Sequence, residues 1–330
     1  MSGPSEVYDL LLDHAAACDE AVREIVIGLT WTLCQSGAGA GLAMSPAAQT
    51  GLETRSLPWS GTLAGRKLSE LAAWLRSWQP FEASVGMAAV NAALNPNLPE
   101  NAVPLAAGNL AVFEHFLPHL AGKRVAVIGR YPGLEVYQQS LDMAVLERRP
   151  GQGDLPDPAA EYLLPGMDWV FLTASSLTNK TFPRLAELSR DANLVLMGPT
   201  TPWLEEMRNF GVDFLAGVAV QDAGQLRTTV AEGGGMRLFD TAVCYHVADL
   251  GAQEMAQLKA EIAEVARERQ YLKDEMESWY AGTRQGAFPR RNELEQLDAR
   301  LSVLDSRFKR LWDARFGGSA DAAPRRQDAA

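Results

Sequence analysis

The chain has 330 residues, of which 47% are hydrophobic and 22% charged, and its formal net charge is −11. Such a composition is typical of a soluble globular protein with room for two domains. The acidic balance argues against a nucleic-acid partner, because a phosphate backbone requires clustered Lys and Arg.

The sequence shows no signal peptide and no apolar run of about 18 residues, so we expect a cytoplasmic protein without a membrane partner. Cys18, Cys34 and Cys244 are scattered and odd in number, which favours reduced thiols. From residue 251 onward the acidic and basic residues cancel. The negative charge therefore belongs to residues 1–250, and the C-terminal part is predicted to be a separate module.

Residues 1–110 are predicted to form an α+β domain. A strand rich in β-branched and aromatic residues is expected at 22–36, and a glycine-rich turn at 37–45 leads into a second strand. Amphipathic or small-residue patterns predict helices at 5–21, 69–78 and 82–95.

Residues 111–250 alternate between apolar strands and helices. The strands are expected at 123–129, 143–147, 168–174, 193–198 and, as the last strand, 212–220. The helices are expected at 134–141, 158–164, 183–191 and 202–211. Short apolar strands separated by helices indicate a parallel sheet covered on both faces, and so a Rossmann-like domain.

Residues 251–316 carry two apolar seams with a step of three and four residues. The first seam runs through Met255, Leu258, Ile262, Val265, Arg269, Leu272, Met276 and Trp279, with Arg269 as its one charged position, and the second through Leu294, Leu297, Leu301, Leu304, Phe308 and Leu311. This pattern predicts an antiparallel helical hairpin, or coiled coil, whose seam can close within one chain or against a second copy. Residues 317–330 have the composition of a disordered tail.

Three loops that follow strands of the parallel sheet are unusual: 129–133 (GRYPG), 175–181 (SSLTNKT) and 198–202 (GPTTP). All three fall at the carboxyl edge of the sheet, where ligands bind in such folds. Helix N-termini offer free amides, and Lys180 adds a full positive charge, so an oxyanion or phosphate is a natural occupant. In the alternative interpretation, Thr181 and Thr201 only cap their helices, with Pro202 at the first helical position.

The loop 129–133 departs from the dinucleotide-binding pattern. It is G-x-x-x-G, and Pro132 removes an N–H group that a pyrophosphate would use. Glu147 follows Gly129 by 18 residues, about where an acid would meet a ribose hydroxyl. Taken together, these features argue against a nicotinamide cofactor.

Three carboxylates, Asp154, Asp157 and Glu161, lie after a strand and could hold a hard cation. Alternatively, Asp157 caps a helix that has Glu161 in its first turn. For a softer metal the candidates are Cys34 with Cys244 and His246, the last two sharing a strand face. Two ligands do not make a site, and buried cysteines also serve as small apolar residues.

His115 and His119 have the spacing of helical zinc ligands, but Pro118 disfavours helix at Leu117, so we do not expect them to face one ion. The sequence holds no G-x-S-x-G elbow and no histidine near the strand ends. Any catalysis would depend on Lys180, a carboxylate or a bound cofactor. Binding without turnover is therefore favoured, and the question of an enzyme stays open.

A set of motifs resembles the DUF364 family of "putative heavy-metal chelation" proteins, whose N-terminal part is the DUF4213 domain. The motifs are GLTWTLC (28–34), SVGMAAVNAALN (84–95), VAVIGRYPG (125–133), RPGQGDLPDPAAEYLLP (149–165), TASSLTNKTFPRLAELSR (173–190), GPTTP (198–202) and FGVDFLAGVAVQD (210–222). The resemblance covers roughly residues 5–235. It implies an N-terminal domain like that of enolase, a Rossmann-like domain, and a cleft between them. The family's best-preserved stretches fall on Gly129, Pro132, Asp154, Asp157, Glu161, Thr178 to Thr181 and Gly198 to Thr200.

These observations predict an accessory protein that binds a metal ion, a metal oxyanion or an anionic metal complex in this cleft, for the supply or maturation of a metalloenzyme. The expected ligand-binding residues are Gly129, Arg130, Pro132, Glu147, Arg149, Ser175, Thr178, Asn179, Lys180, Thr181, Gly198, Thr200 and Thr201. One alternative is an enzyme for a nucleotide-like or phosphorylated molecule, with Glu147 at a ribose and Lys180 at a phosphate. Another is an interaction protein that binds a client or a second copy through residues 251–316.

Overall fold

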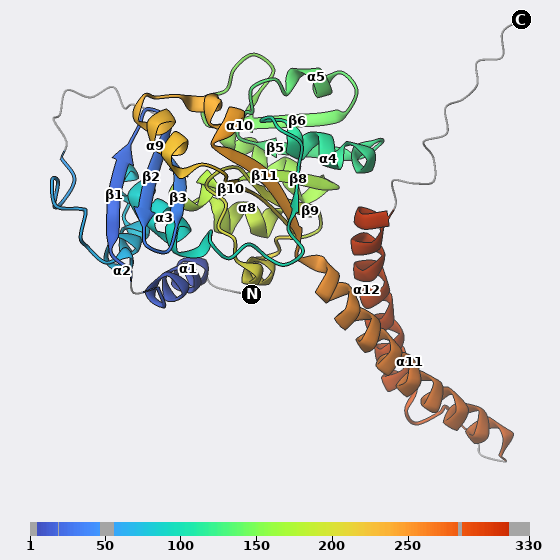
Figure 1. Cartoon of the computed structure of the whole chain (residues 1–330). Helices are drawn as coiled ribbons and strands as arrows, with labels where there is room; N and C mark the ends of the chain where they lie inside the picture. Colours follow the sequence, from blue (N-terminus) through green and yellow to red (C-terminus); the bar gives the residue numbers. More distant parts are fainter. Residues whose placement is uncertain (1–4, 19, 47–55, 283–285, 317–330) are drawn as a thin grey trace, which may run out of the picture. The chain divides into compact units, whose positions relative to one another are not determined.

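The computed structural model describes residues 5–18, 20–46, 56–282 and 286–316 (Figure 1). The chain divides into two compact units, Met1–Leu250 and Gly251–Ala330. None of the described helices is both long and apolar enough to cross a membrane. The predicted disordered tail at 317–330 lies outside the described residues.

The first unit begins with a small antiparallel sheet of three strands, β1 (Val22–Ile27), β2 (Trp31–Ser36) and β3 (Ala40–Met44). The single strand predicted at 22–36 is therefore wrong, because the chain turns between β1 and β2. Gly28 permits this turn: its amide donates to the Trp31 carbonyl, and a Cβ at Gly28 would lie 2.3 Å from the Val230 carbonyl oxygen.

Helix α3 (Pro80–Leu94) packs against β2 and β3, and α1 (Glu6–Ala16) and α2 (Leu68–Ala72) pack beside it. Small residues let α3 approach the sheet closely, as predicted: a Cβ at Gly41 of β3 would lie 2.1 Å from the Ala92 amide nitrogen. A short 3-10 helix (Ala73–Arg76) follows α2. The other side of the small sheet receives α9 (Ala223–Ala231), which contacts β1 and β2 (Figure 1). The sequence did not reveal α9.

The large sheet has eight strands in the order β4-β11-β10-β9-β8-β5-β6-β7. The strands are β4 (Val103–Pro104), β5 (Arg124–Ile128), β6 (Asp142–Glu147), β7 (Leu155–Pro156), β8 (Trp169–Thr173), β9 (Asn193–Met197), β10 (Phe214–Val220) and β11 (Val243–Asp249). From β7 to β10 all neighbours are parallel, whereas β11 and β4 add antiparallel pairs. The mixed α/β fold with a Rossmann-like parallel sheet is thus confirmed. The last strand is β11 and not β10 as predicted.

Helices cover this sheet and join its strands. They are α4 (Ala111–Leu120), α5 (Glu135–Gln138), α6 (Ala160–Leu163), α7 (Ser175–Thr178), α8 (Phe182–Leu188) and α10 (Leu238–Thr241). Short 3-10 turns lie at Asp157–Ala159, Leu164–Gly166, Glu205–Phe210 and Gly235–Arg237. The helix predicted at 202–211 is therefore wrong: only Glu205–Phe210 is helical, and as a 3-10 turn.

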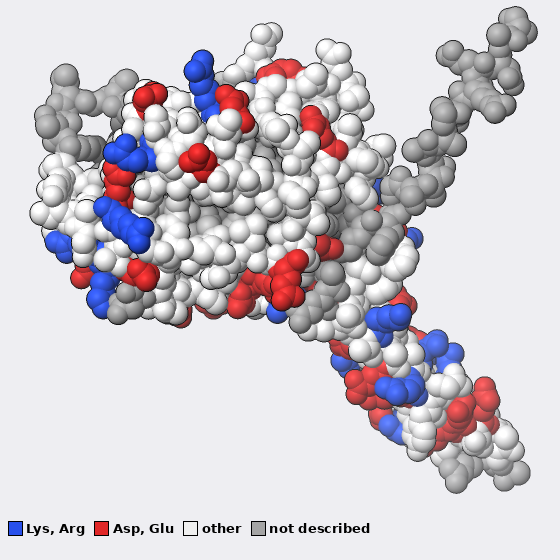
Figure 2. Space-filling view, in the orientation of Figure 1, with Lys and Arg blue, Asp and Glu red and all other residues white. Residues whose placement is uncertain are grey.

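The second unit is a helical hairpin of α11 (Gly251–Ala281) and α12 (Arg291–Phe316). Leu258 and Val265 of α11 bury against Leu304 and Leu311 of α12, so the seam closes within one chain. Ion pairs such as Glu261 with Arg300 at 2.7 Å follow the antiparallel order. Figure 2 shows acidic and basic side chains closely mixed on its surface. Docking of a client or a second copy through this hairpin stays a prediction.

Candidate functional site

The carboxyl ends of β5, β6, β8 and β9 meet at one edge of the large sheet, and their loops enclose a cavity of about 1230 Å³. Other lining residues come from the small sheet and α3 and from the segment around α10. All but one of the predicted ligand-binding residues line this cavity, namely Gly129, Arg130, Pro132, Glu147, Arg149, Ser175, Thr178, Asn179, Lys180, Thr181, Gly198 and Thr200. Thr201 is the exception. The three unusual loops therefore share one hollow that faces the small sheet.

Gly129 needs to be glycine for two reasons. Its φ of +92° lies in the left-handed region, and an added Cβ would come within 3.0 Å of Thr173 Cγ2 on β8. The turn after β5 places the backbone amide of Arg130 beside Glu147, the last residue of β6. The Pro132 carbonyl oxygen accepts a hydrogen bond of 2.7 Å from Asn109 Nδ2.

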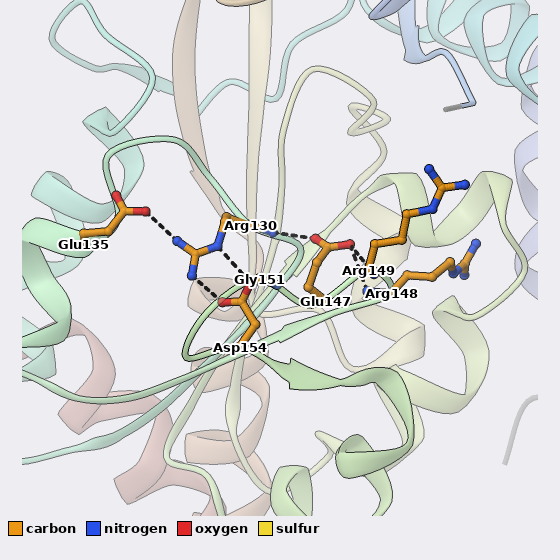
Figure 3. Close-up of polar contacts among 7 residues, drawn as sticks. All are labelled: Arg130, Glu135, Glu147, Arg148, Arg149, Gly151 and Asp154. Carbon is orange, nitrogen blue, oxygen red and sulfur yellow. Dashed lines mark hydrogen bonds and ion pairs between the residues drawn. The ribbon is translucent and has the colours of Figure 1, made fainter. Parts of the chain in front are cut away.

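Glu147 sits at the end of β6 and holds two loops by their backbones (Figure 3). Its Oε2 accepts from the Arg130 amide at 2.9 Å, and its Oε1 accepts from the amides of Arg148 at 2.8 Å and Arg149 at 3.5 Å. The backbone N–H groups that could have donated hydrogen bonds to a ligand oxygen therefore already donate to a carboxylate of the protein. The predicted role of Glu147 at a ribose hydroxyl is not supported by this geometry.

Arg130 is held by two carboxylates (Figure 3). Its Nε donates to Asp154 Oδ2 at 2.9 Å, Nη2 bonds Asp154 Oδ1, and Nη1 bonds Glu135. The hydrogen bonds from Arg130 lower the pKa of Asp154, whose side chain is almost fully buried and also accepts from the Gly151 amide. Arg130 therefore fixes the loop after β6 and has little capacity left for a ligand.

The structure does not bring together the three carboxylates predicted to hold a cation. Asp154 faces Arg130, Asp157 faces Arg148 at 3.3 Å, and Glu161 binds Arg184 through both oxygens. Hydrogen bonds from Arg184 lower the pKa of Glu161. Across the described part of the chain, no three His, Cys, Asp or Glu side chains are grouped so that they could hold a metal ion. Each of the three carboxylates is held by a different arginine, and the spacing along the sequence did not reveal this pairing.

Lys180 is positioned by the loop between α7 and α8 and has a left-handed φ of +69°. Its Nζ donates to the carbonyl oxygens of Leu75 and of Thr178, the latter at 3.1 Å, and lies 5.1 Å from the centre of the Tyr8 ring. Burial lowers the pKa of Lys180 to about 8. The ammonium group lies at the cleft but is engaged by backbone carbonyls, which ties this loop to the small-sheet part.

The hydroxyl and amide groups of the loop 175–181 bond mostly among themselves. Asn179 Oδ1 accepts from both the amide and the hydroxyl of Thr181. Thr181 therefore stands at the N-cap position of α8, as the alternative interpretation predicted, but its side chain makes no capping hydrogen bond. Thr178 Oγ1 donates to the Ser175 carbonyl at 2.7 Å, and Ser175 Oγ lies 3.0 Å from Thr173 Oγ1.

The turn after β9 is mainly structural. Thr200 Oγ1 accepts from the Met44 amide at 2.9 Å, and its carbonyl accepts from Asn91 Nδ2, which joins the large sheet to the small one. Thr201 is buried away from the cavity, and its Oγ1 has no partner among the described atoms. The cap predicted for Thr201 is wrong, since no helix begins at Pro202.

The cysteines and histidines lie apart from the cleft. Cys34 is fully buried in the core, and this burial raises the pKa of its thiol to about 12. Cys244 Sγ lies 3.6 Å from His246 Nδ1 on one face of β11, as the alternation predicted, and accepts from Gln221 at 3.0 Å. Among the described residues, Cys34, Cys244 and His246 do not form a group that could hold a metal ion.

Helix α4 continues through Pro118, so the predicted break at Leu117 is wrong. Phe113 and Phe116 anchor the helix on the sheet by ring contacts with Phe171, and this packing offsets the hydrogen bond that proline cannot make. His115 and His119 thus share a helix. Burial, and then the neighbouring His119, lower the pKa of His115.

One part of the cleft was missed by the sequence analysis. Four large, partly or fully exposed apolar side chains also line the cavity and are called its apolar wall here: Leu29, Met44, Trp78 and Met236. They come from separate segments, so neither their spacing nor their periodicity could have identified them. Trp31 Nε1 helps to place this wall, since it donates to the Gly235 carbonyl at 2.9 Å.

The chain and its fold are similar to several known proteins. Two family models, both described as "Putative heavy-metal chelation", match the chain: DUF364 at residues 111–249 and DUF4213 at residues 8–94. A crystal structure of a DUF364-family protein of unknown function from Desulfitobacterium hafniense is 32% identical with a TM-score of 0.63, and the match covers 75% of this chain and 98% of that one.

A second crystal structure, of a DUF364-family protein of unknown function from Pyrococcus horikoshii, has a TM-score of 0.61 at 21% identity. It covers 74% of this chain and 99% of that one, and at this identity the likeness concerns the fold alone. An uncharacterized protein from Methanocaldococcus jannaschii is 28% identical over 165 residues, which is 48% of this chain. The chain spans 62% of the length of that relative.

Proposed function

The chain belongs to the DUF364 family, and from this premise we propose that it binds an anionic, metal-bearing small molecule in its cleft and serves as an accessory protein for a metalloenzyme. The observation that carries the proposal is the contrast between the cavity and its side chains. The cavity of about 1230 Å³ is far larger than a bare ion needs, yet no three described metal-ligating side chains converge. A metal that entered this cleft would therefore bring its own ligands.

The charge of the cleft supports an anionic complex. Five basic side chains, Arg130, Arg148, Arg149, Lys180 and Arg184, line it against three acidic ones, Glu147, Asp157 and Glu161. The whole chain, in contrast, carries a formal charge of −11. Arg130, Arg148 and Arg184 pair with carboxylates, so Arg149 and Lys180 are the basic side chains of the lining without a described carboxylate partner, and these two would attract a negative ligand.

Binding without turnover is favoured by the chemistry of the lining. No histidine or cysteine belongs to the described lining of the cleft, so it offers neither an imidazole base nor a thiol nucleophile, and the lining carboxylates Asp157 and Glu161 are engaged by arginines. A nucleotide-like substrate receives less support, because Glu147 is engaged with loop amides and Lys180 with backbone carbonyls.

The test is to purify the full chain from its own host and to analyse it by native mass spectrometry and elemental analysis. We expect an added mass that contains a metal and is released as an intact complex on denaturation. A preparation from the host that carries no metal, and takes up no metal complex from a host extract, would contradict the proposal.

A further inference from the structure

The apolar wall of the cleft is unusually exposed. The residues Leu29 and Trp78 are 85% and 83% exposed, and Met44 and Met236 are 43% and 38% exposed. Single exposed apolar residues are ordinary on protein surfaces, but four that line one cavity indicate a binding surface.

The backbone holds this wall in place. The Met44 amide donates to Thr200 Oγ1 at 2.9 Å, and its carbonyl accepts from Ser84 Oγ at 2.8 Å. Met236 follows Gly235, whose carbonyl is bound by Trp31. The backbone segments that carry Met44 and Met236 are thus fixed by hydrogen bonds.

The lining also offers one cation without a protein partner in the described part of the chain. Arg130, Arg148 and Arg184 each pair with carboxylates, and Lys180 bonds carbonyl oxygens. The Arg149 guanidinium makes no ion pair with a described carboxylate, while the Arg149 amide is bound by Glu147. In Figure 3 the Arg149 side chain extends away from the Glu147 carboxylate.

We propose that the cleft is built for an amphipathic organic anion, whose broad apolar face packs on Leu29, Met44, Trp78 and Met236 and whose acidic group pairs with Arg149. The inference deepens the proposed function and rests on the same cleft. The cavity exceeds the range of about 300–1,000 Å³ typical of sites for drug-sized ligands, which suits an extended organic frame better than a bare oxyanion. In such a complex the metal is held by the organic frame.

The test uses the full chain and two aromatic probes that differ in charge. 8-Anilinonaphthalene-1-sulfonate carries an acid on an aromatic frame, and N-phenyl-1-naphthylamine has that frame without the acid. Both probes gain fluorescence in an apolar site, and circular dichroism verifies that each variant is folded. We expect saturable binding of both probes to the native protein.

The variants separate the contribution of Arg149 from that of the apolar wall. Arg149→Gln should lower the affinity for the sulfonate probe by about tenfold to a hundredfold, which corresponds to the loss of one hydrogen bond to a charged group. The affinity for the neutral probe should stay unchanged. Trp78→Ala should weaken both probes. Matched controls are Arg23→Gln and Tyr162→Ala, since both residues are exposed and outside the described lining, and neither change should affect binding.

Three results would overturn the inference: no binding of either probe, equal weakening of both probes by Arg149→Gln, or full displacement of the sulfonate probe by inorganic sulfate alone. Failure here can be told apart from failure of the proposed function. A host preparation that carries metal while neither probe binds refutes only the amphipathic ligand. Probe binding with the expected variant effects, in a protein that never carries metal, supports the ligand class and refutes the metal role.

Discussion

Replacement of Glu147 by Gln tests whether this carboxylate organises the cleft. Its two oxygens accept from the amides of Arg130 at 2.9 Å and Arg148 at 2.8 Å, with a longer contact to Arg149. Glutamine keeps one acceptor oxygen and turns an NH₂ group towards the remaining amide, so at least one of the two short hydrogen bonds is lost. A hydrogen bond to a charged group contributes about 1.5–3 kcal/mol, so we expect a loss of about 2 kcal/mol.

In a unit of this size the loss corresponds to a decrease in Tm of roughly 4–8 °C. Differential scanning calorimetry measures the change, and hydrogen exchange at the Arg130 and Arg148 amides gives a local readout that should accelerate in the variant. Glu232→Gln is the matched control, because Glu232 is exposed and its side chain makes no hydrogen bond to any residue within the described ranges. Equal Tm values for the two variants, with unchanged exchange at both amides, would refute the argument.

Three further predictions concern the fold and one buried amine. Leu304→Asp should unfold the hairpin, since Leu304 is 8% exposed in the seam, whereas Val303→Asp at a 68% exposed position should not; circular dichroism at 222 nm compares them. Gly28→Ala should destabilise the first unit, because the new methyl group would meet a backbone carbonyl of α9, and Gly224→Ala inside α9, where the methyl group would meet only the side-chain Oδ1 of Asp222 at 3.3 Å, should cost much less in the same urea titration. Burial lowers the pKa of Lys180 to about 8, below the unfolded value of about 10.5, so the unfolded state binds more protons between these values. The stability of the wild type relative to Lys180→Met should therefore rise from pH 8 to 10.5, and a constant or falling difference in urea denaturation would contradict this assignment.

The local pattern of apolar residues was enough to predict the parallel sheet and the position of its loops. A short apolar run such as residues 168–174, rich in aromatic and β-branched residues, is typical of a central strand, and the carboxyl ends of parallel strands meet at one edge. The loops 129–133, 175–181 and 198–202 were therefore predicted at one hollow, and the structure places them there. The apolar seam between α11 and α12 was also predicted from the sequence, because the spacing of three and four residues follows from the geometry of a single helix.

Other features depended on contacts between distant segments. Helix α4 persists through Pro118 because its aromatic face packs on the sheet, which the local preference of proline could not indicate. Helix α9 has a weak pattern of its own and is stabilised on the small sheet, where Arg227 pairs with Glu24 at 2.7 Å. The break at Gly28 follows from the close approach of the same helix.

The sequence by itself determined the fold class and the edge of the sheet where a ligand would bind, since both follow from side-chain period and strand direction. Only the tertiary structure decided what the cleft can hold. Asp154, Asp157 and Glu161 pair with separate arginines, Glu147 and Lys180 bond backbone groups, and Trp78 and other apolar side chains line the same cavity as Arg149. The reason is physical: partners that neutralise a charge, or assemble an apolar wall, are chosen by proximity in space, and spacing along the chain does not encode that proximity.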